Sequence, residues 1–147
     1  MKPALAIFLS LLLTGCWLPD IRLKRDVSPE EVVGTWTMTD DSLRDIKTDS
    51  DASGISGSRK DYKIEIRKDG TLRYRSILQI PTRAVDYQGT WKLEPRTNPP
   101  KGNQLDILLD TNGGYAFSLD FTEEDGKLMI WTFFGDPDSW RLEKYEK

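Results

Sequence analysis

Short segments that alternate between apolar and polar residues, joined by short turns, occupy most of the chain. In the clearest of them Tyr62, Ile64 and Ile66 alternate with charged residues, which is the period of a strand that buries one face. Asp69-Gly70 follows at once and indicates a type I′ hairpin turn, and Asp125-Gly126 is a second such dipeptide. The pattern as a whole predicts eight strands, over residues 34–39, 62–67, 72–78, 87–93, 105–109, 115–121, 128–133 and 140–143.

Turns this short leave no room for the crossovers that parallel strands require, so neighbouring strands should pair antiparallel. Closing eight such strands into a barrel removes the exposed edges of the sheet. We therefore expect an all-β fold, an eight-stranded antiparallel up-and-down barrel, with a two-sheet β-sandwich as the alternative. Ser28-Pro29-Glu30-Glu31 predicts a short helix before the first strand. In the long connection 40–61, Leu43 and Ile46 fit one turn of helix.

The composition fits one domain and removes several classes of chemistry. The 147 residues are 37% hydrophobic and 31% charged, which is enough apolar material for a single core. The chain has no His and one Cys, which excludes His-based catalytic triads, Cys/His zinc clusters and an internal disulfide. The net charge of −3 argues against a nucleic-acid partner, which would need a basic face. We expect no metal and no cofactor.

The N-terminus carries the pattern of an export signal. Pro3 to Leu13 is an apolar run of eleven residues, too short to cross a bilayer as a helix, which takes about 20. The run ends in Leu13-Thr14-Gly15-Cys16, and this stretch resembles the lipobox of bacterial lipoprotein precursors. The resemblance implies cleavage before Cys16, a thioether-linked diacylglycerol on its sulfur, and often a further acyl chain such as palmitate. An ordinary secreted protein with a chance cysteine is the alternative.

This interpretation divides the chain into three parts. Residues 1–15 are the lipoprotein signal peptide, 16–28 are the lipidated Cys and a tether, and 29–147 are the β-barrel domain. The lipid is then the expected link to the membrane of the cell envelope. Trp17 follows the cysteine where lipoproteins retained in the inner membrane carry Asp, so the resemblance implies the outer membrane in a Gram-negative cell. In a Gram-positive cell the anchor would lie in the outer leaflet of the plasma membrane.

The motif Gly34-Thr35-Trp36 enters the first predicted strand from the short helix and resembles the G-x-W motif of lipocalins and lipocalin-like bacterial domains. The resemblance covers about residues 30–147 as an architecture, and only the first and last strands at the level of motifs. It implies that Trp36 closes one end of the barrel beneath a basic residue of the last strand. Arg141 is the first candidate for that pair, and Lys144 is the second.

Aromatic residues mark the expected interior of the barrel. By their alternation, Trp36, Tyr74, Tyr87, Trp91 and Phe117 fall on the face that points inward, where they would line a ligand cavity or fill it. A barrel of eight strands is just wide enough to hold one small ligand or to be packed by its own side chains. The sequence leaves both arrangements open.

No constellation supports catalysis, so we expect a protein that is not an enzyme. Asp106, Asp110 and Asp120 fall on the outer face of their strands, where carboxylates meet solvent. Asp49-x-Asp51 opens like a calcium loop, but Lys60 stands where the twelfth residue of such a loop is a bidentate Glu. A solvated acidic loop is the better interpretation.

Two functions from different classes remain. The first is a lipid-anchored envelope protein that binds a small hydrophobic ligand inside the barrel. The alternative is a protein-interaction module of the envelope, either an assembly factor or an inhibitor of a hydrolase. An open, apolar barrel mouth favours the first, whereas a filled barrel with an exposed stripe of Met129, Trp131 and Phe133 favours the second.

Overall fold

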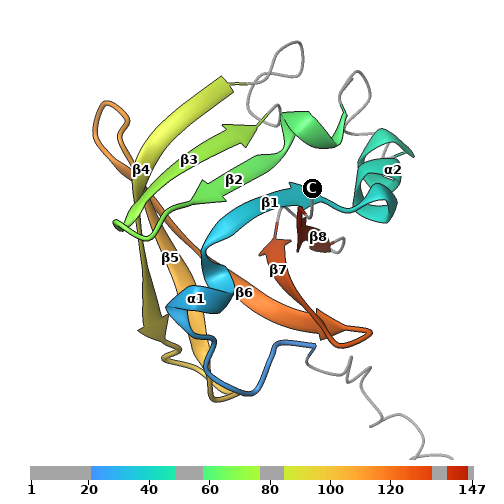
Figure 1. The fold of residues 1–147 in the computed structure, drawn as a ribbon, viewed down its shortest axis with the longest axis vertical. Helices are drawn as coiled ribbons and strands as arrows, with labels where there is room; N and C mark the ends of the chain where they lie inside the picture. The colour runs from blue at the N-terminus through green and yellow to red at the C-terminus, as the bar shows by residue number, and fades with distance from the viewer. Residues whose placement is uncertain (1–20, 49–57, 77–84, 134–138, 146–147) are drawn as a thin grey trace, which may run out of the picture.

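The computed structural model describes residues 21–48, 58–76, 85–133 and 139–145. Within them eight antiparallel strands form a closed barrel in chain order, in which each strand pairs with the next and the last pairs with the first (Figure 1). This confirms the predicted up-and-down barrel and excludes the two-sheet sandwich. The strands are β1 (Gly34–Met38), β2 (Lys63–Ile66), β3 (Thr71–Ser76), β4 (Val85–Pro95), β5 (Asn103–Leu109), β6 (Tyr115–Glu124), β7 (Lys127–Phe133) and β8 (Ser139–Lys144).

Three short helices accompany the strands in the described part of the chain. α1 (Pro29–Val32) begins with a capping box, in which the Ser28 hydroxyl accepts from the Glu31 N–H and the Glu31 carboxylate accepts from the Ser28 N–H. α2 (Asp40–Thr48) follows β1 closely and is longer than the single turn predicted there. η1 (Arg59–Asp61) is a 3₁₀ helix just before β2.

The up-and-down order gives the barrel two different ends. α1, the β2–β3 turn, the β4–β5 loop and the β6–β7 turn lie at one end, which we call the α1 end. α2 and the β5–β6 turn lie at the other, the α2 end, at the top of Figure 1. Side chains alternate along each strand, so every second residue faces the interior. The position of such a residue along its strand determines whether it lies near the α1 end or near the α2 end.

Large apolar side chains fill much of the barrel interior. Trp36 and Phe121 are fully buried, and they are the largest of the buried side chains in the described residues. The next largest fully buried side chains in the described ranges are Met38, Ile64, Leu72, Leu105, Ile107, Leu109, Ile130 and Val32. Burial of side chains of this size contributes about 1.5–3 kcal/mol each. A ligand site inside the barrel must therefore lie beside these buried side chains and not in the space that they occupy.

Residues 21–28 were expected to belong to a tether, and this expectation is wrong, because they pack along the α1 end. The Leu23 N–H and the Ile21 carbonyl are both hydrogen-bonded to β6, at 2.7 and 2.8 Å. Val27 is buried, and the Asn103 side chain bonds both its N–H (2.9 Å) and its carbonyl (2.8 Å). The segment therefore belongs to the folded domain.

The two Asp-Gly turns differ from each other. At Asp125-Gly126 both residues have positive φ (51° and 74°), as the predicted type I′ turn requires. At Asp69-Gly70 only the glycine does (83°), so the expected type I′ turn does not form. Arg67 instead donates its N–H to the Thr71 carbonyl and accepts the glycine N–H, which makes a wider turn with the glycine in a bulge. The aspartate stabilises this turn by accepting the Thr71 N–H at 2.9 Å.

Candidate functional site

Four aromatic side chains meet inside the barrel toward the α2 end: Tyr74 on β3, Tyr87 on β4, and Tyr115 and Phe117 on β6. We call them the aromatic cluster. The ring centroids lie 6.3 Å apart for Tyr74–Tyr87, 5.9 Å for Tyr74–Phe117 and 5.5 Å for Tyr115–Phe117. These separations are typical of favourable aromatic pairs. Because β3 and β6 are not neighbours in the sheet, the Tyr74–Phe117 contact crosses the barrel interior.

The aromatic cluster extends from the core to solvent. Tyr74, Tyr87 and Phe117 are half-buried and pack against the core, whereas Tyr115 is 53% exposed. Among the described residues, β4 contributes no fully buried apolar side chain, since its inward residues around Gly89 are only half-buried. The inward side chains of β4 therefore shield the interior from solvent less completely than those of strands with fully buried residues. An apolar molecule could contact the half-buried rings of the aromatic cluster there.

Tyr62, between η1 and β2, adds a polar group to this interior. Its side chain is 3% exposed, and its hydroxyl has no hydrogen-bond partner among the described residues. Burial first, and then the negative charges of Asp61 and an ionised Tyr74, raise the pKa of Tyr62 to about 12. The phenol therefore stays protonated and keeps an O–H donor inside the barrel. Alternation identified Tyr62 as a strand residue, but only its unpaired hydroxyl in the fold marks it as a candidate binding group.

We expect Tyr62→Phe to make the protein less sensitive to alkali. In the parent, the stability that comes from the neutral phenol is complete below the unfolded pKa of 10 and is lost as the pH rises toward about 12, because unfolding lets the hydroxyl ionise. At neutral pH, loss of an unpaired buried hydroxyl should change the free energy of unfolding by less than about 1 kcal/mol.

Denaturant unfolding at neutral and alkaline pH measures both effects. Tyr115→Phe is the matched control, because it removes the same kind of hydroxyl from a side chain that is 53% exposed. If Tyr62→Phe and the parent lost stability equally in alkali, the buried neutral phenol would be ruled out.

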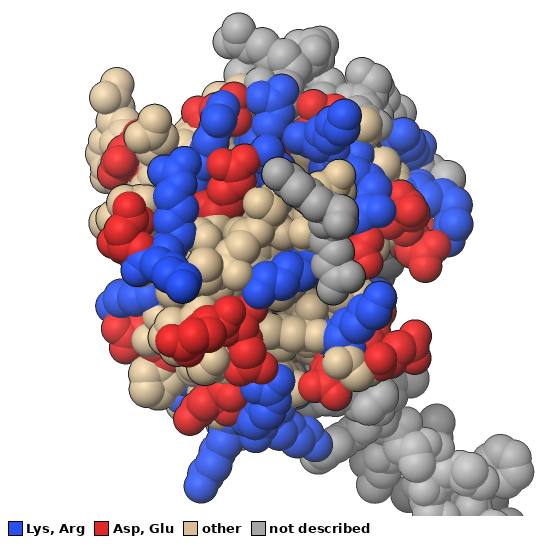
Figure 2. Space-filling view, viewed as in Figure 1, with Lys and Arg blue, Asp and Glu red and all other residues tan. Residues whose placement is uncertain are grey.

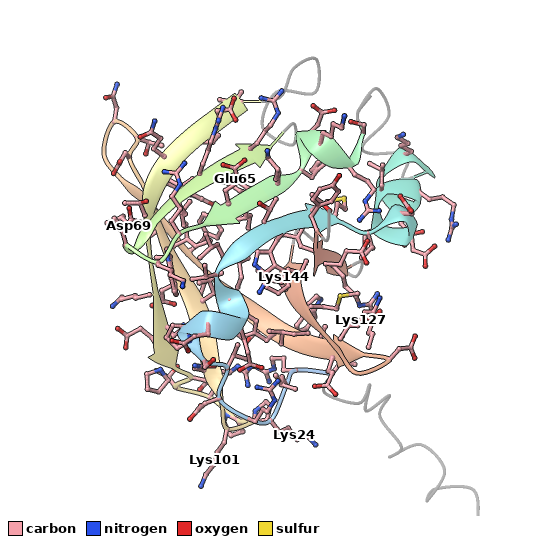
Figure 3. The ribbon with its side chains drawn as sticks, in the orientation of Figure 1. Lys24, Glu65, Asp69, Lys101, Lys127 and Lys144 are labelled. Carbon is pink, nitrogen blue, oxygen red and sulfur yellow. The ribbon has the colours of Figure 1, made fainter. Side chains whose placement is uncertain are left out.

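Trp36 is fully buried in the core, and it also contributes to the floor of the surface hollow over β7 and β8 that is described below. Its indole N–H donates to the Val32 carbonyl at 2.7 Å, and the Lys144 ammonium lies 5.6 Å from the ring centroid, beside β1 (Figure 3). Arg141 was expected to cover the Trp36 ring, and this expectation is wrong. Lys144, the second candidate, lies over the ring instead. The β1–β8 register pairs Trp36 with Lys144, so both face inward, whereas Arg141 is an odd number of residues away and faces outward. There Arg141 forms an ion pair with Glu124.

Trp91 also lies apart from the aromatic cluster. It is half-buried on the inward face of β4, four residues beyond Tyr87, which is about 13 Å along an extended strand. Its indole N–H donates to the Arg67 carbonyl at 2.8 Å, over the β2–β3 turn. Of the five residues predicted to line a cavity, three therefore come together in the aromatic cluster, while Trp36 and Trp91 do not. Tyr115, at the first position of β6, was not among the five.

A surface hollow of about 470 Å³ lies over β7 and β8. Its lining includes Met129, Lys127 and Lys144, and Figure 2 shows uncharged surface on this face, interrupted and surrounded by charged side chains. Arg59 reaches into the lining, where its guanidinium forms an ion pair with Glu143. Within this lining the charges of Arg59 and Glu143 therefore neutralise each other.

A second hollow, of about 460 Å³, lies on the outer face of β4, β5 and β6. Its apolar lining includes Leu108, which is 49% exposed, and Ala116, together with Trp91, Ile107 and Phe117 of the same strands. Asp106 and Ser118 lie beside them, and the Ser118 hydroxyl donates to the Asp106 carboxylate at 2.7 Å. This surface is the outer wall of the same strands that carry Tyr87 and Phe117 inside.

The strand carboxylates do not converge on a catalytic cleft. Asp106 is bonded to Ser118, Asp120 forms an ion pair with Arg96 at 2.6 Å, and Asp110 is exposed. Asp49-x-Asp51 lies outside the described residues. Over the described ranges, no three residues of the types His, Cys, Asp or Glu are grouped so as to hold a metal ion.

The stripe expected for an interaction module is not an exposed one where the structure describes it. Met129 is buried and Trp131 is half-buried, although both lie on the outward face of β7, and the Phe133 side chain lies outside the described part.

None of the helices in the described ranges has the length and apolar character to cross a membrane. Comparisons of the chain with protein-family models, with curated proteins and with solved structures gave no match.

Proposed function

We propose that the protein is a bacterial envelope lipoprotein that is anchored through Cys16. It holds a small apolar ligand at the α2 end of its barrel and does not catalyse a reaction. One observation carries the ligand site: the rings of the aromatic cluster contact one another from the half-buried Phe117 and Tyr74 to the exposed Tyr115. The lipobox-like Leu13-Thr14-Gly15-Cys16 supports the anchor.

The packing of the interior favours the α2 end over a deep cavity. Trp36 and Phe121 already occupy the space near α1, so a ligand there would have to displace fully buried side chains. At the aromatic cluster a planar apolar molecule gains ring contacts with little rearrangement. The unpaired Tyr62 hydroxyl adds a donor, so the preferred ligand carries a hydrogen-bond acceptor at one end.

Tyr115→Ser should weaken the binding of an apolar fluorescent probe, anilinonaphthalene sulfonate, severalfold. Tyr145→Ser is the matched control, because Tyr145 follows β8 at the α1 end and is 54% exposed, against 53% for Tyr115. Neither substitution should lower the free energy of unfolding by much, since both side chains are about half exposed to solvent.

The probe is titrated into the acylated protein in lipid nanodiscs, and the signal of empty nanodiscs is subtracted. Equal probe affinity for the parent and Tyr115→Ser, or an equal loss in Tyr145→Ser, would count against a site at the aromatic cluster.

Cys16→Ser should abolish the incorporation of an alkyne-labelled fatty acid in a bacterial host and leave the precursor uncleaved. The hydroxyl of serine does not replace the thiol as acceptor of the diacylglycerol. Trp17→Ser, at the next position, is expected to keep the label. A fatty-acid label that persists on Cys16→Ser would refute the lipoprotein proposal, whatever the barrel binds.

A second candidate, the envelope interaction module, is supported by the outer face of β4–β6. Leu108 is 49% exposed beside Ala116, in the hollow of about 460 Å³. A photoreactive residue at position 108 should then crosslink to an envelope protein, whereas the same residue at the exposed Lys92, at the polar side of that hollow, should do so less. Crosslinking at neither position would leave the ligand-binding function as the better proposal.

A further inference from the structure

We propose that the α1 end of the barrel faces the membrane surface and that the α2 end, with the aromatic cluster, faces away from it. This inference rests on the proposed acylation of Cys16. The partner is the phospholipid headgroup surface, and residues 21–27 together with α1 form the part of the barrel that lies against it.

The first step is the attachment of the N-terminal segment to the barrel. The Ile21 carbonyl accepts the Thr122 hydroxyl at 2.8 Å, and the Leu23 N–H donates to the Phe121 carbonyl at 2.7 Å. The Leu23 carbonyl in turn accepts from Arg96 at 2.8 Å, and the Arg96 side chain is 2% exposed. Detaching the segment would leave a buried guanidinium short of an acceptor, so the chain stays on the barrel from Ile21 onward.

The second step is the length of chain that remains. Only residues 17–20 separate Cys16 from Ile21, and five backbone steps reach at most about 18 Å. An acylated Cys16 lies at the bilayer surface, so the α1 end is held within that distance of the headgroups. Along β6, the β5–β6 turn lies beyond Tyr115, which is six residues, or about 20 Å, from the point where Leu23 is bonded. The tether therefore holds the α1 end closer to the membrane than the α2 end.

The side chains exposed at the α1 end are compatible with a headgroup surface. Lys24 and Lys101 extend from the foot of the barrel in Figure 3, and neither has an ion-pair partner among the described residues. Tyr145 is 54% exposed at the same end, and tyrosine and lysine are both suited to a membrane interface. The exposed acids Asp26 and Glu30 offset the lysine charges, so the short tether, and not the net charge, sets the orientation.

Fluorophores on single cysteines test this orientation, because an acylated Cys16 leaves no competing thiol. Lys24→Cys and Lys101→Cys report on the α1 end, and Asn112→Cys reports on the β5–β6 turn; all three positions are exposed. In vesicles of phosphatidylethanolamine and phosphatidylglycerol with a nitroxide on some headgroups, quenching at 24 and 101 should exceed quenching at 112 severalfold. Equal quenching at all three positions, or the strongest quenching at 112, would overturn the orientation.

A variant with a longer tether provides the matched control. Insertion of about ten Gly and Ser residues after Asp20 lets the barrel move freely over the bilayer and should reduce the difference in quenching. An unchanged difference would overturn the tether as its cause. Flotation of the same samples separates the two proposals. A chain that does not float and keeps a reactive Cys16 thiol refutes the anchor, and the orientation with it. A chain that floats but is quenched most at 112 refutes the orientation alone.

Discussion

Trp36→Ala should lower the free energy of unfolding by about 3–5 kcal/mol, which is the range for buried aromatic side chains. The Trp36 ring is fully buried, its N–H is bonded to the Val32 carbonyl at 2.7 Å, and the Lys144 ammonium lies above it. Alanine would leave a cavity between α1 and the barrel and an unpaired carbonyl beside it. Denaturant unfolding of the parent and the variant measures the difference.

Two further variants separate the contributions to this effect. Trp36→Phe keeps most of the apolar surface and loses the indole N–H, so its loss should be intermediate. Lys144→Met removes the cation, whose ammonium also donates to the Glu31 carbonyl at 2.9 Å, and should cost less than about 1 kcal/mol because the side chain is exposed. A loss below about 1 kcal/mol for Trp36→Ala would contradict the burial of the ring and the β1 register that produces it.

The barrel could be predicted because the sequence patterns that indicate its strands and turns each span only a few neighbouring residues. Alternation in segments such as Tyr62–Ile66 and short turns between strands depend only on neighbouring residues. The pairing of Trp36 with Lys144 joins residues more than a hundred positions apart and depends on how the last strand closes on the first. The available signal was Leu142, an apolar residue whose alternation places Lys144, and not Arg141, on the inward face.

The candidate site could be predicted only in part, because alternation gives the face of a residue but not its position along the barrel axis. Tyr87 and Trp91 share the inward face of β4, yet one contacts Tyr74 and the other bonds the β2–β3 turn. The docking of residues 21–28 was missed for a related reason. That segment has no period of its own, and its contacts come from Asn103, Arg96 and β6, which are distant in the sequence.

Gly89→Ala should cost roughly 3 kcal/mol, which is the upper part of the range for overpacking and a large effect for one methyl group. The added Cβ would stand 2.2 Å from the Leu108 carbonyl oxygen and 3.0 Å from the Leu109 Cα. These are backbone atoms, so no side-chain rotation relieves the contact. β4 and β5 would have to separate where Gly89 pairs with Leu109.

This separation should also weaken the proposed binding of an apolar ligand, since Tyr87 lies only two residues from Gly89 on the same inward face. The bond from the Asp110 N–H to the Gln88 carbonyl, 2.8 Å long, lies beside the same contact, so amide exchange at Asp110 should accelerate. Gln88→Ala is the matched control, because its side chain is exposed and its loss should change the free energy of unfolding by less than about 0.5 kcal/mol. A Gly89→Ala protein as stable as the parent would contradict the close approach of β4 and β5, and with it the wall that positions Tyr87 in the aromatic cluster.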